Sequence, residues 1–122
     1  MQVKIYHNPR CSKSRQTLDL LHQRGIEPEV IRYLDTPLNE SDIKALLARL
    51  DMQAKDLLRS KEPEARELGL TDANTDDDQI ISAMASHPKL MERPVVVVDD
   101  SRAVIGRPPE RVFELLDADP SS

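Results

Sequence analysis

The chain contains a single cysteine, Cys11, which lies between a β-rich run and a helical pattern. Its neighbours Arg10, Lys13 and Arg15 place three positive charges within four residues of the thiol. A cysteine thiol in a peptide ionises near pH ~8.5, and a helix N-terminus and nearby cations lower that value. We therefore expect Cys11 to be a reactive thiolate, in a loop whose free backbone N–H groups also suit an incoming oxyanion.

A free cysteine is often a small, buried and inert residue, which is the alternative interpretation of Cys11. The three cations and Pro9 argue against a dry apolar pocket at this point. A dithiol oxidoreductase would carry a second cysteine at position 14, which is Ser14 here. A serine hydroxyl can hydrogen-bond a thiolate or the backbone of the first helical turn, but it cannot resolve a disulfide. A catalytic cycle at Cys11 therefore needs a second thiol from another molecule.

Composition narrows the class of protein. The length of 122 residues suits one domain, and the formal net charge of −5 does not favour nucleic-acid binding. No apolar stretch is long enough to span a bilayer, and the first residues do not form a signal peptide. With its lone cysteine, the chain is expected to be a cytoplasmic monomer without membrane or nucleic-acid partners. His7, His22 and His87 lack the spacing of a ligand set, so we expect no bound metal.

The hydrophobic pattern predicts a strand at residues 3–6, a helix at 12–24 ending before Gly25, and a strand at 29–33. A helical segment follows at residues 36–50, which Asn39 or Ser41 can cap, and others follow at 51–58, 63–68 and 77–87. Four consecutive valines at 95–98 predict a buried strand, with a hairpin partner at 103–105 and a last helix from residue 109 or 110.

This order of elements predicts an α/β fold, namely a thioredoxin-like mixed four-stranded sheet with a helical insertion between its two halves. We expect one domain at residues 1–116, with the insertion at about 37–92 and a short polar tail at 117–122. The first strand then ends at the edge of the sheet where ligands of α/β proteins bind, and Cys11 lies there.

Three arginines lie at predicted element boundaries, from which a scaffold could direct them at an oxyanion; they are Arg59, Arg93 and Arg107. Guanidinium stays charged and binds such an anion bidentately. Taken singly, each is more simply a surface residue, since most exposed ion pairs contribute little. Arg59, for example, could pair with Glu62 or Asp56. Spacing alone does not bring the three together.

Several motifs in combination resemble the glutaredoxin-coupled arsenate reductases. They are His7-Asn8-Pro9-x-Cys11-x-x-Ser14-Arg15, Leu57-Leu58-Arg59, Arg93-Pro94 before the valine-rich strand, and Gly106-Arg107-Pro108. The similarity extends from Val3 to about Leu116. Although no single motif is specific, the set is.

The resemblance implies a thioredoxin-like fold with a cis peptide bond before Pro94. It implies that Cys11 is the nucleophile and that the three arginines bind the oxygens of arsenate. It implies that His7 and Ser14 help to keep the sulfur ionised, and we expect Arg15 to support the thiolate through its positive charge. No cofactor would be bound; glutathione would attack the Cys11–arsenic adduct as co-substrate, and glutaredoxin would clear the mixed disulfide.

Two other functions stay open at the level of the sequence. One is a glutathione-linked reductase that acts on another substrate. The other is a non-catalytic thioredoxin-fold regulator that binds RNA polymerase. Such regulators often carry a second cysteine at the position of Ser14, so its absence, together with the three arginines, counts against this alternative.

Overall fold

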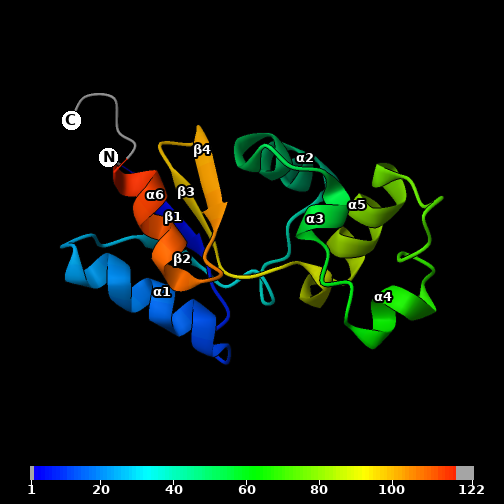
Figure 1. Ribbon diagram of the computed structural model, residues 1–122, viewed down its shortest axis with the longest axis horizontal. Coiled ribbons are helices and arrows are strands. Elements are labelled where there is room, and N and C mark those ends of the chain that lie inside the picture. The colour runs from blue at the N-terminus through cyan, green and yellow to red at the C-terminus, as the bar shows by residue number, and fades with distance from the viewer. Residues whose placement is uncertain (1, 118–122) are drawn as a thin grey trace. The chain divides into compact units, whose positions relative to one another are not determined.

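The computed structural model describes residues 2–117 (Figure 1). The chain divides into two compact units, which we call the sheet unit and the helical unit. The sheet unit combines the residues up to 36 with those from 93 onward, and the helical unit is residues 37–92. The junctions fall at the ends of the segment expected as a helical insertion. Of the expected polar tail, Asp117 is the last residue of a helix, and residues 118–122 lie outside the described part.

A mixed four-stranded sheet with the thioredoxin-like strand order forms the centre of the sheet unit. Its strands are β1 (Val3–Tyr6), β2 (Glu29–Ile31), β3 (Val95–Val98) and β4 (Arg102–Ile105). The order is β2-β1-β3-β4, with β1 parallel to β2 and antiparallel to β3. The predicted fold class is therefore confirmed.

The second strand is shorter than predicted, because it ends at Ile31 instead of residue 33. Arg32 already belongs to a turn, in which its carbonyl accepts the N–H groups of Asp35 and Thr36 at 2.9 and 3.0 Å. This turn follows the carboxyl end of β2, next to the carboxyl end of β1 in the sheet.

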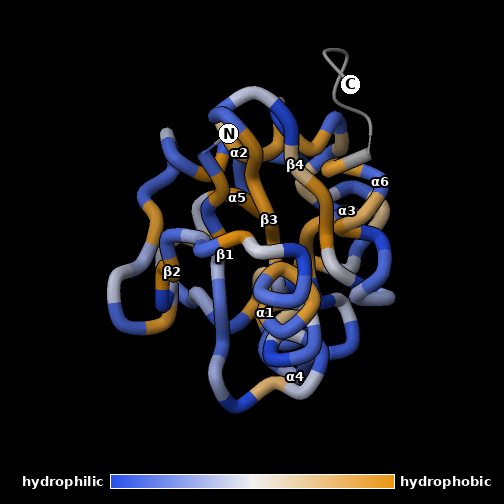
Figure 2. Tube along the Cα trace, turned by 90° about the vertical axis from the view of Figure 1, so that its left-hand side faces the viewer, coloured by the Kyte–Doolittle hydropathy of each residue, from blue (hydrophilic) through white to orange (hydrophobic). Residues whose placement is uncertain are grey.

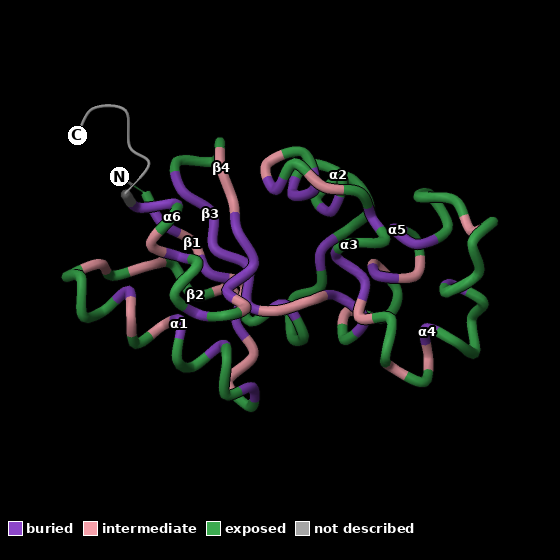
Figure 3. The backbone as a smooth tube through the Cα atoms, in the orientation of Figure 1, coloured by how far each residue is buried: buried purple, intermediate pink, exposed green. Residues whose placement is uncertain are grey.

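The four valines of β3 are buried along the whole strand, which is hydrophobic throughout in Figure 2 and buried throughout in Figure 3. Val96 and Val98 point to one face of the sheet, since side chains alternate along a strand. There they join a core cluster with Leu21 of α1 (Ser12–Gln23) and Val112 of α6 (Val112–Asp117). A 3₁₀ turn, η2 (Pro109–Arg111), precedes α6. Burial on both faces explains why β3 lacks the polar alternation of a half-exposed strand.

The helical unit contains α2 (Glu40–Leu50), α3 (Ala54–Leu57), α4 (Pro63–Glu67), α5 (Asp77–Ser86) and a 3₁₀ turn, η1 (Pro88–Leu90). Asn39 and Asp76 cap α2 and α5, since each side chain accepts a backbone N–H of the first turn, at 2.8 and 2.9 Å. The prediction of a helix at 51–58 was wrong at its start, because Asp51 ends α2 with a left-handed φ of 55°. Within the described residues, no helix combines the length and apolarity needed to cross a bilayer.

Candidate active site

Cys11 is the N-cap residue of α1, at the end of the loop that leaves β1. Its N–H donates to the carbonyl of Asn8 and its carbonyl accepts the N–H of Arg15, both at 3.0 Å. These bonds fix the thiol beside the free N–H groups of the first helical turn. The residue is 9% exposed, so the sulfur is accessible only over a small area.

Burial raises the pKa of the Cys11 thiol, but several groups oppose it and leave the pKa below its ordinary value. The backbone N–H groups of Ser14 and Lys13 hydrogen-bond the sulfur, and the Arg93 guanidinium adds a positive charge and a further hydrogen bond. Each of these favours the thiolate over the thiol. The thiolate expected from the sequence thus depends on the helix N-terminus and on a cation 82 positions along the chain.

The first turn of α1 is tied to the β1 loop through the hydroxyl of Ser14. The hydroxyl lies 2.6 Å from Nδ1 of His7 and accepts the backbone N–H of Asn8 at 3.0 Å. Ser14 and His7 are both buried. Ser14 therefore favours the thiolate through its backbone N–H, while its side chain holds the loop in place.

His7 is neutral at pH 7 in this environment. Burial lowers its pKa below the ordinary value, and the positive charges of Arg32 and Arg15 lower it further. Because the hydroxyl of Ser14 accepts the Asn8 N–H, its own proton is free to go to Nδ1 of a neutral imidazole. Arg15 thus lowers the pKa of His7, whereas the arginine that lowers the pKa of Cys11 is Arg93.

Arg93 and Arg107 lie together where β3 begins and β4 ends. Val95 pairs with Ile105 in the sheet, and the Arg107 guanidinium donates from Nη1 to the carbonyl of Arg93 at 3.2 Å. The peptide bond before Pro94 is cis, as the resemblance implies. The bond before Pro108 is also cis, which no sequence argument had indicated.

Gly106 and Thr17 form a contact that sequence reasoning missed. A Cβ atom added to Gly106 would lie 2.6 Å from Oγ1 of Thr17 and 3.0 Å from Cγ of Pro94. Thr17 is fully buried and donates from Oγ1 to the carbonyl of Lys13 at 2.9 Å. The second turn of α1 thus packs directly on the Gly106–Pro94 backbone. The glycine before Arg107 was the one available signal.

Arg59 belongs to the helical unit, two residues after the end of α3. Its Nη2 atom lies 2.7 Å from Oε1 of Glu62, and Nη1 donates to the carbonyl of Lys89 at 3.1 Å. The ion pair with Glu62 that the sequence allowed is therefore present. Its role as a ligand of arsenate stays a prediction.

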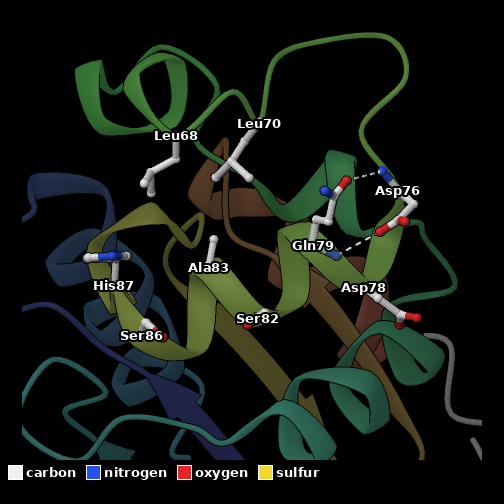
Figure 4. Close-up of a pocket in the computed structure, with 9 residues that line it drawn as sticks. All are labelled: Leu68, Leu70, Asp76, Asp78, Gln79, Ser82, Ala83, Ser86 and His87. Carbon is white, nitrogen blue, oxygen red and sulfur yellow. Dashed lines mark hydrogen bonds between the residues drawn. The ribbon is translucent and has the colours of Figure 1, made fainter.

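Two pockets of the protein differ in size, in lining residues and in their position relative to Cys11. A pocket of about 200 Å³ lies beside the nucleophile loop and is lined by His7, Asn8, Pro9, Arg10, Arg32, Leu34 and Asp35. A pocket of about 500 Å³ lies along α5 in the helical unit, with Leu68 and Leu70 facing the helix (Figure 4). Its Asp76 and Gln79 are occupied by the capping hydrogen bonds drawn there. The smaller pocket is thus the one that adjoins a nucleophile.

No group of three or more metal-binding side chains is found within residues 2–117. The described site combines a cysteine whose pKa is lowered with two guanidinium groups and backbone N–H groups.

Comparison with known proteins identifies relatives across nearly the whole length. Residues 6–115 match the ArsC family. An uncharacterized protein of Escherichia coli (strain K12), YfgD, is 53% identical over 116 residues, which cover 94% of this chain and 97% of that protein. An arsenate reductase of Neisseria meningitidis serogroup A is 45% identical over 116 residues, with 94% and 98% covered. The solved structure of an arsenate reductase from Vibrio cholerae superposes with a TM-score of 0.90 at 49% identity, covering 93% of this chain and 97% of that one.

Proposed function

Because this chain belongs to the ArsC family, we propose that it reduces arsenate to arsenite through the Cys11 thiolate, with glutathione and glutaredoxin as thiol donors. The observation that supports this most is the lowered pKa of Cys11 beside the Arg93 guanidinium. Relatives named arsenate reductase, at 45% and 49% identity, point to the same substrate.

The charges of the site suit the attack of one anion on another. Arsenate and the thiolate repel each other, so the approach needs positive charge fixed in advance. Arg93 lies at the sulfur and Arg107 is hydrogen-bonded to the Arg93 backbone, while the α1 N-terminus supplies N–H groups. In the proposal, Arg59 from the helical unit is the third oxyanion ligand.

The reaction proceeds in three steps that balance in electrons. The Cys11 thiolate attacks arsenic(V), and one oxygen leaves as water after protonation. A glutathione thiolate then attacks the Cys11 sulfur, the sulfur–arsenic bond breaks, and its electron pair stays on arsenic, which becomes arsenic(III). Two sulfurs have now been oxidised to a mixed disulfide. The glutaredoxin thiolate attacks the glutathione sulfur and releases Cys11 as a thiolate.

The need for an external thiol follows from the residues of the loop. The chain contains one cysteine, and position 14 holds a serine whose hydroxyl is engaged with His7 and Asn8. An internal disulfide is therefore excluded as a resolving step.

The test is arsenite release by the purified protein with arsenate, glutathione and glutaredoxin. We expect turnover that is lost in Cys11→Ser and kept in Ser12→Ala, an exposed neighbour in the same helical turn. Equal turnover by Cys11→Ser, or none by the unmodified protein, would contradict the proposal. A stable Cys11–glutathione adduct without arsenate turnover would instead indicate a glutathione-linked reductase of another substrate.

A further inference from the structure

The pocket beside the nucleophile loop presents a positive and a negative group side by side. Nε of Arg32 lies 3.1 Å from Oδ2 of Asp35, and both residues line the pocket. Arg10 adds a second cation and Asn8 a side-chain amide. Both side chains of the ion pair are 61% exposed, so an incoming group can reach them.

An α-amino acid group is the natural complement of such a pair, because it carries a carboxylate and an ammonium on one carbon. The carboxylate would bind the guanidinium groups and the ammonium would bind Asp35. The volume of about 200 Å³ is below the range of about 300–1,000 Å³ of sites that enclose drug-sized ligands. The pocket therefore suits one amino-acid-sized end of a larger molecule.

The position of the pocket connects it to the reaction. Pro9 and Arg10 line it and directly precede Cys11, and consecutive Cα atoms lie about 3.8 Å apart. The Asn8 carbonyl, from the same wall, accepts the N–H of Cys11. A molecule held here by one end has its next residue beside the nucleophile loop.

We propose that this pocket binds the γ-glutamyl end of glutathione and so places the glutathione thiolate for attack on the Cys11 sulfur. The identity of the thiol rests on the proposed function. Glutathione carries its free α-carboxylate and α-ammonium at that end, and its cysteine is the next residue. The specificity for a γ-glutamyl thiol therefore comes from Arg32, which would bind the α-carboxylate, and Asp35, which would bind the α-ammonium. Arg10 adds a second positive charge for the carboxylate.

The test uses thiol exchange at Cys11 and contains no arsenate. Cys11 is first converted with Ellman's reagent to a mixed disulfide with thionitrobenzoate. A thiolate then attacks the Cys11 sulfur, the old S–S bond breaks, and coloured thionitrobenzoate leaves with the electron pair. The second-order rate constant is measured for glutathione, γ-glutamylcysteine and cysteinylglycine at pH ~8, where a histidine of lowered pKa is neutral.

Arg32→Gln and Asp35→Asn should each slow glutathione and γ-glutamylcysteine about fivefold, the upper end expected for exposed ion pairs. Cysteinylglycine, which lacks the γ-glutamyl group, should change less than about twofold. The matched control is Arg66→Gln, an exposed arginine of the helical unit, which should leave all three rate constants unchanged. Equal slowing of all three thiols, or none, would overturn the assignment.

The result is separable from that of the proposed function. Selective slowing in a protein that does not turn over arsenate would keep the pocket assignment and refute the arsenate proposal. Arsenate turnover in a protein whose variants show no thiol selectivity would keep the arsenate proposal and refute the pocket assignment.

Discussion

At Cys11, burial and local electrostatics act on the pKa in opposite directions, and the electrostatic groups prevail. Two of them are backbone N–H groups, which every substitution except proline leaves in place. The Arg93 guanidinium is the charged side chain in the set, and it contributes both charge and a hydrogen bond. Substitution of Arg93 therefore tests the electrostatic part with the helix left intact.

Arg93→Gln should raise the pKa of Cys11, because it removes a cation that stabilises the thiolate. Thiolate absorbance against pH would show the shift. Since only the thiolate attacks, the acid limb of the pH–rate profile should move to higher pH. Arg111→Gln, an exposed arginine of η2, is the control and should leave the midpoint in place. An unchanged midpoint in Arg93→Gln would contradict the role given to this residue.

His7 should make the free energy of unfolding depend on pH. Its pKa is lower in the folded protein than its ordinary value of 6.5, so the unfolded chain binds the proton first on acidification. Stability should therefore fall as the pH drops from about 6.5 through the folded pKa, and level off below it. His7→Asn keeps a polar atom near Ser14 and removes the titration, so the slope should flatten in denaturant titrations. Gln16→Ala, at an exposed position of α1 with no titratable group, should keep the slope of the unmodified protein.

The residues of the candidate site could be predicted from the sequence. The groups that lower the pKa of Cys11 could be predicted only in part. Cys11 and the helix N-terminus are adjacent in the chain, so their coupling is local. The positive side chain that lowers the pKa of Cys11 is Arg93. The sequence instead indicated the cations that are close to Cys11 along the chain, Arg10, Lys13 and Arg15. That contact depends on the pairing of β1 with β3, which no local pattern encodes.

At the scale of elements, the start of α5 is set by a capping box between Asp76 and Gln79. Asp76→Ala removes the acceptor for the Gln79 N–H and should lower the free energy of unfolding by about 1 kcal/mol. Asp77→Ala, one residue later in the first turn, keeps the cap and should cost less. Urea denaturation of both variants measures the difference, and equal losses would show that the cap contributes nothing beyond its charge.

The packing of α1 on the strand-end loops makes Gly106 sensitive to one added methyl group. Gly106→Ala should destabilise the protein by roughly 1–3 kcal/mol, because the new Cβ would collide with Thr17 Oγ1. Combination with Thr17→Ala should recover part of the loss, so the double variant should be more stable than the sum of the single effects predicts. Strict additivity in thermal or urea unfolding would contradict direct contact between the two positions.

Element positions could be predicted where local chemistry decides them. The buried valines of β3 and the left-handed Gly25 follow from residue type, and the cap of α2 is Asn39, one of the two candidates that residue type allowed. The errors lie where tertiary geometry decides. β2 stops at Ile31 because Arg32 enters a turn, and Asp51 leaves the helical conformation although its side chain does not demand it.

At the scale of the whole molecule, the cation and N–H groups that lower the pKa of Cys11 belong to the sheet unit, whereas Arg59 belongs to the helical unit. Arg59 is not among the groups that lower the pKa of Cys11, so Arg59→Gln should leave the thiolate titration of Cys11 unchanged. If Arg59 binds arsenate, the same variant should lower kcat/KM for arsenate about tenfold, the loss of one charge-assisted hydrogen bond.

Two measurements on each of two variants, the thiolate titration and the kinetics with arsenate, separate these roles. Arg93→Gln should change both the titration and the kinetics, and Arg59→Gln only the kinetics. Full activity of Arg59→Gln would show that Arg59 does not bind arsenate and that its role is confined to its contacts within the helical unit, such as those with Glu62 and Lys89. The sequence could name Arg59 and Arg93 as candidates, yet it could not show that Arg93 is the one that lowers the pKa of Cys11, because that contact forms only in the folded chain.

The junction between Glu92 and Arg93, where the chain passes from the helical unit to the sheet unit, has a consequence for how the two units can be inherited. The segment of residues 37–92 ends immediately before Arg93, so the residue at the second junction is the cation that acidifies the thiol. If recombination between two related genes exchanged this segment as one block, the helices of residues 37–92 would come from the donor gene. Cys11, His7 and Ser14 would still come from the recipient gene. The charged side chain that favours the thiolate would be encoded by one codon at the crossover point, whereas the two backbone N–H groups would stay with Cys11. The exchanged block would also bring its own residue at position 59, so the oxyanion ligand proposed there would be inherited with the helices.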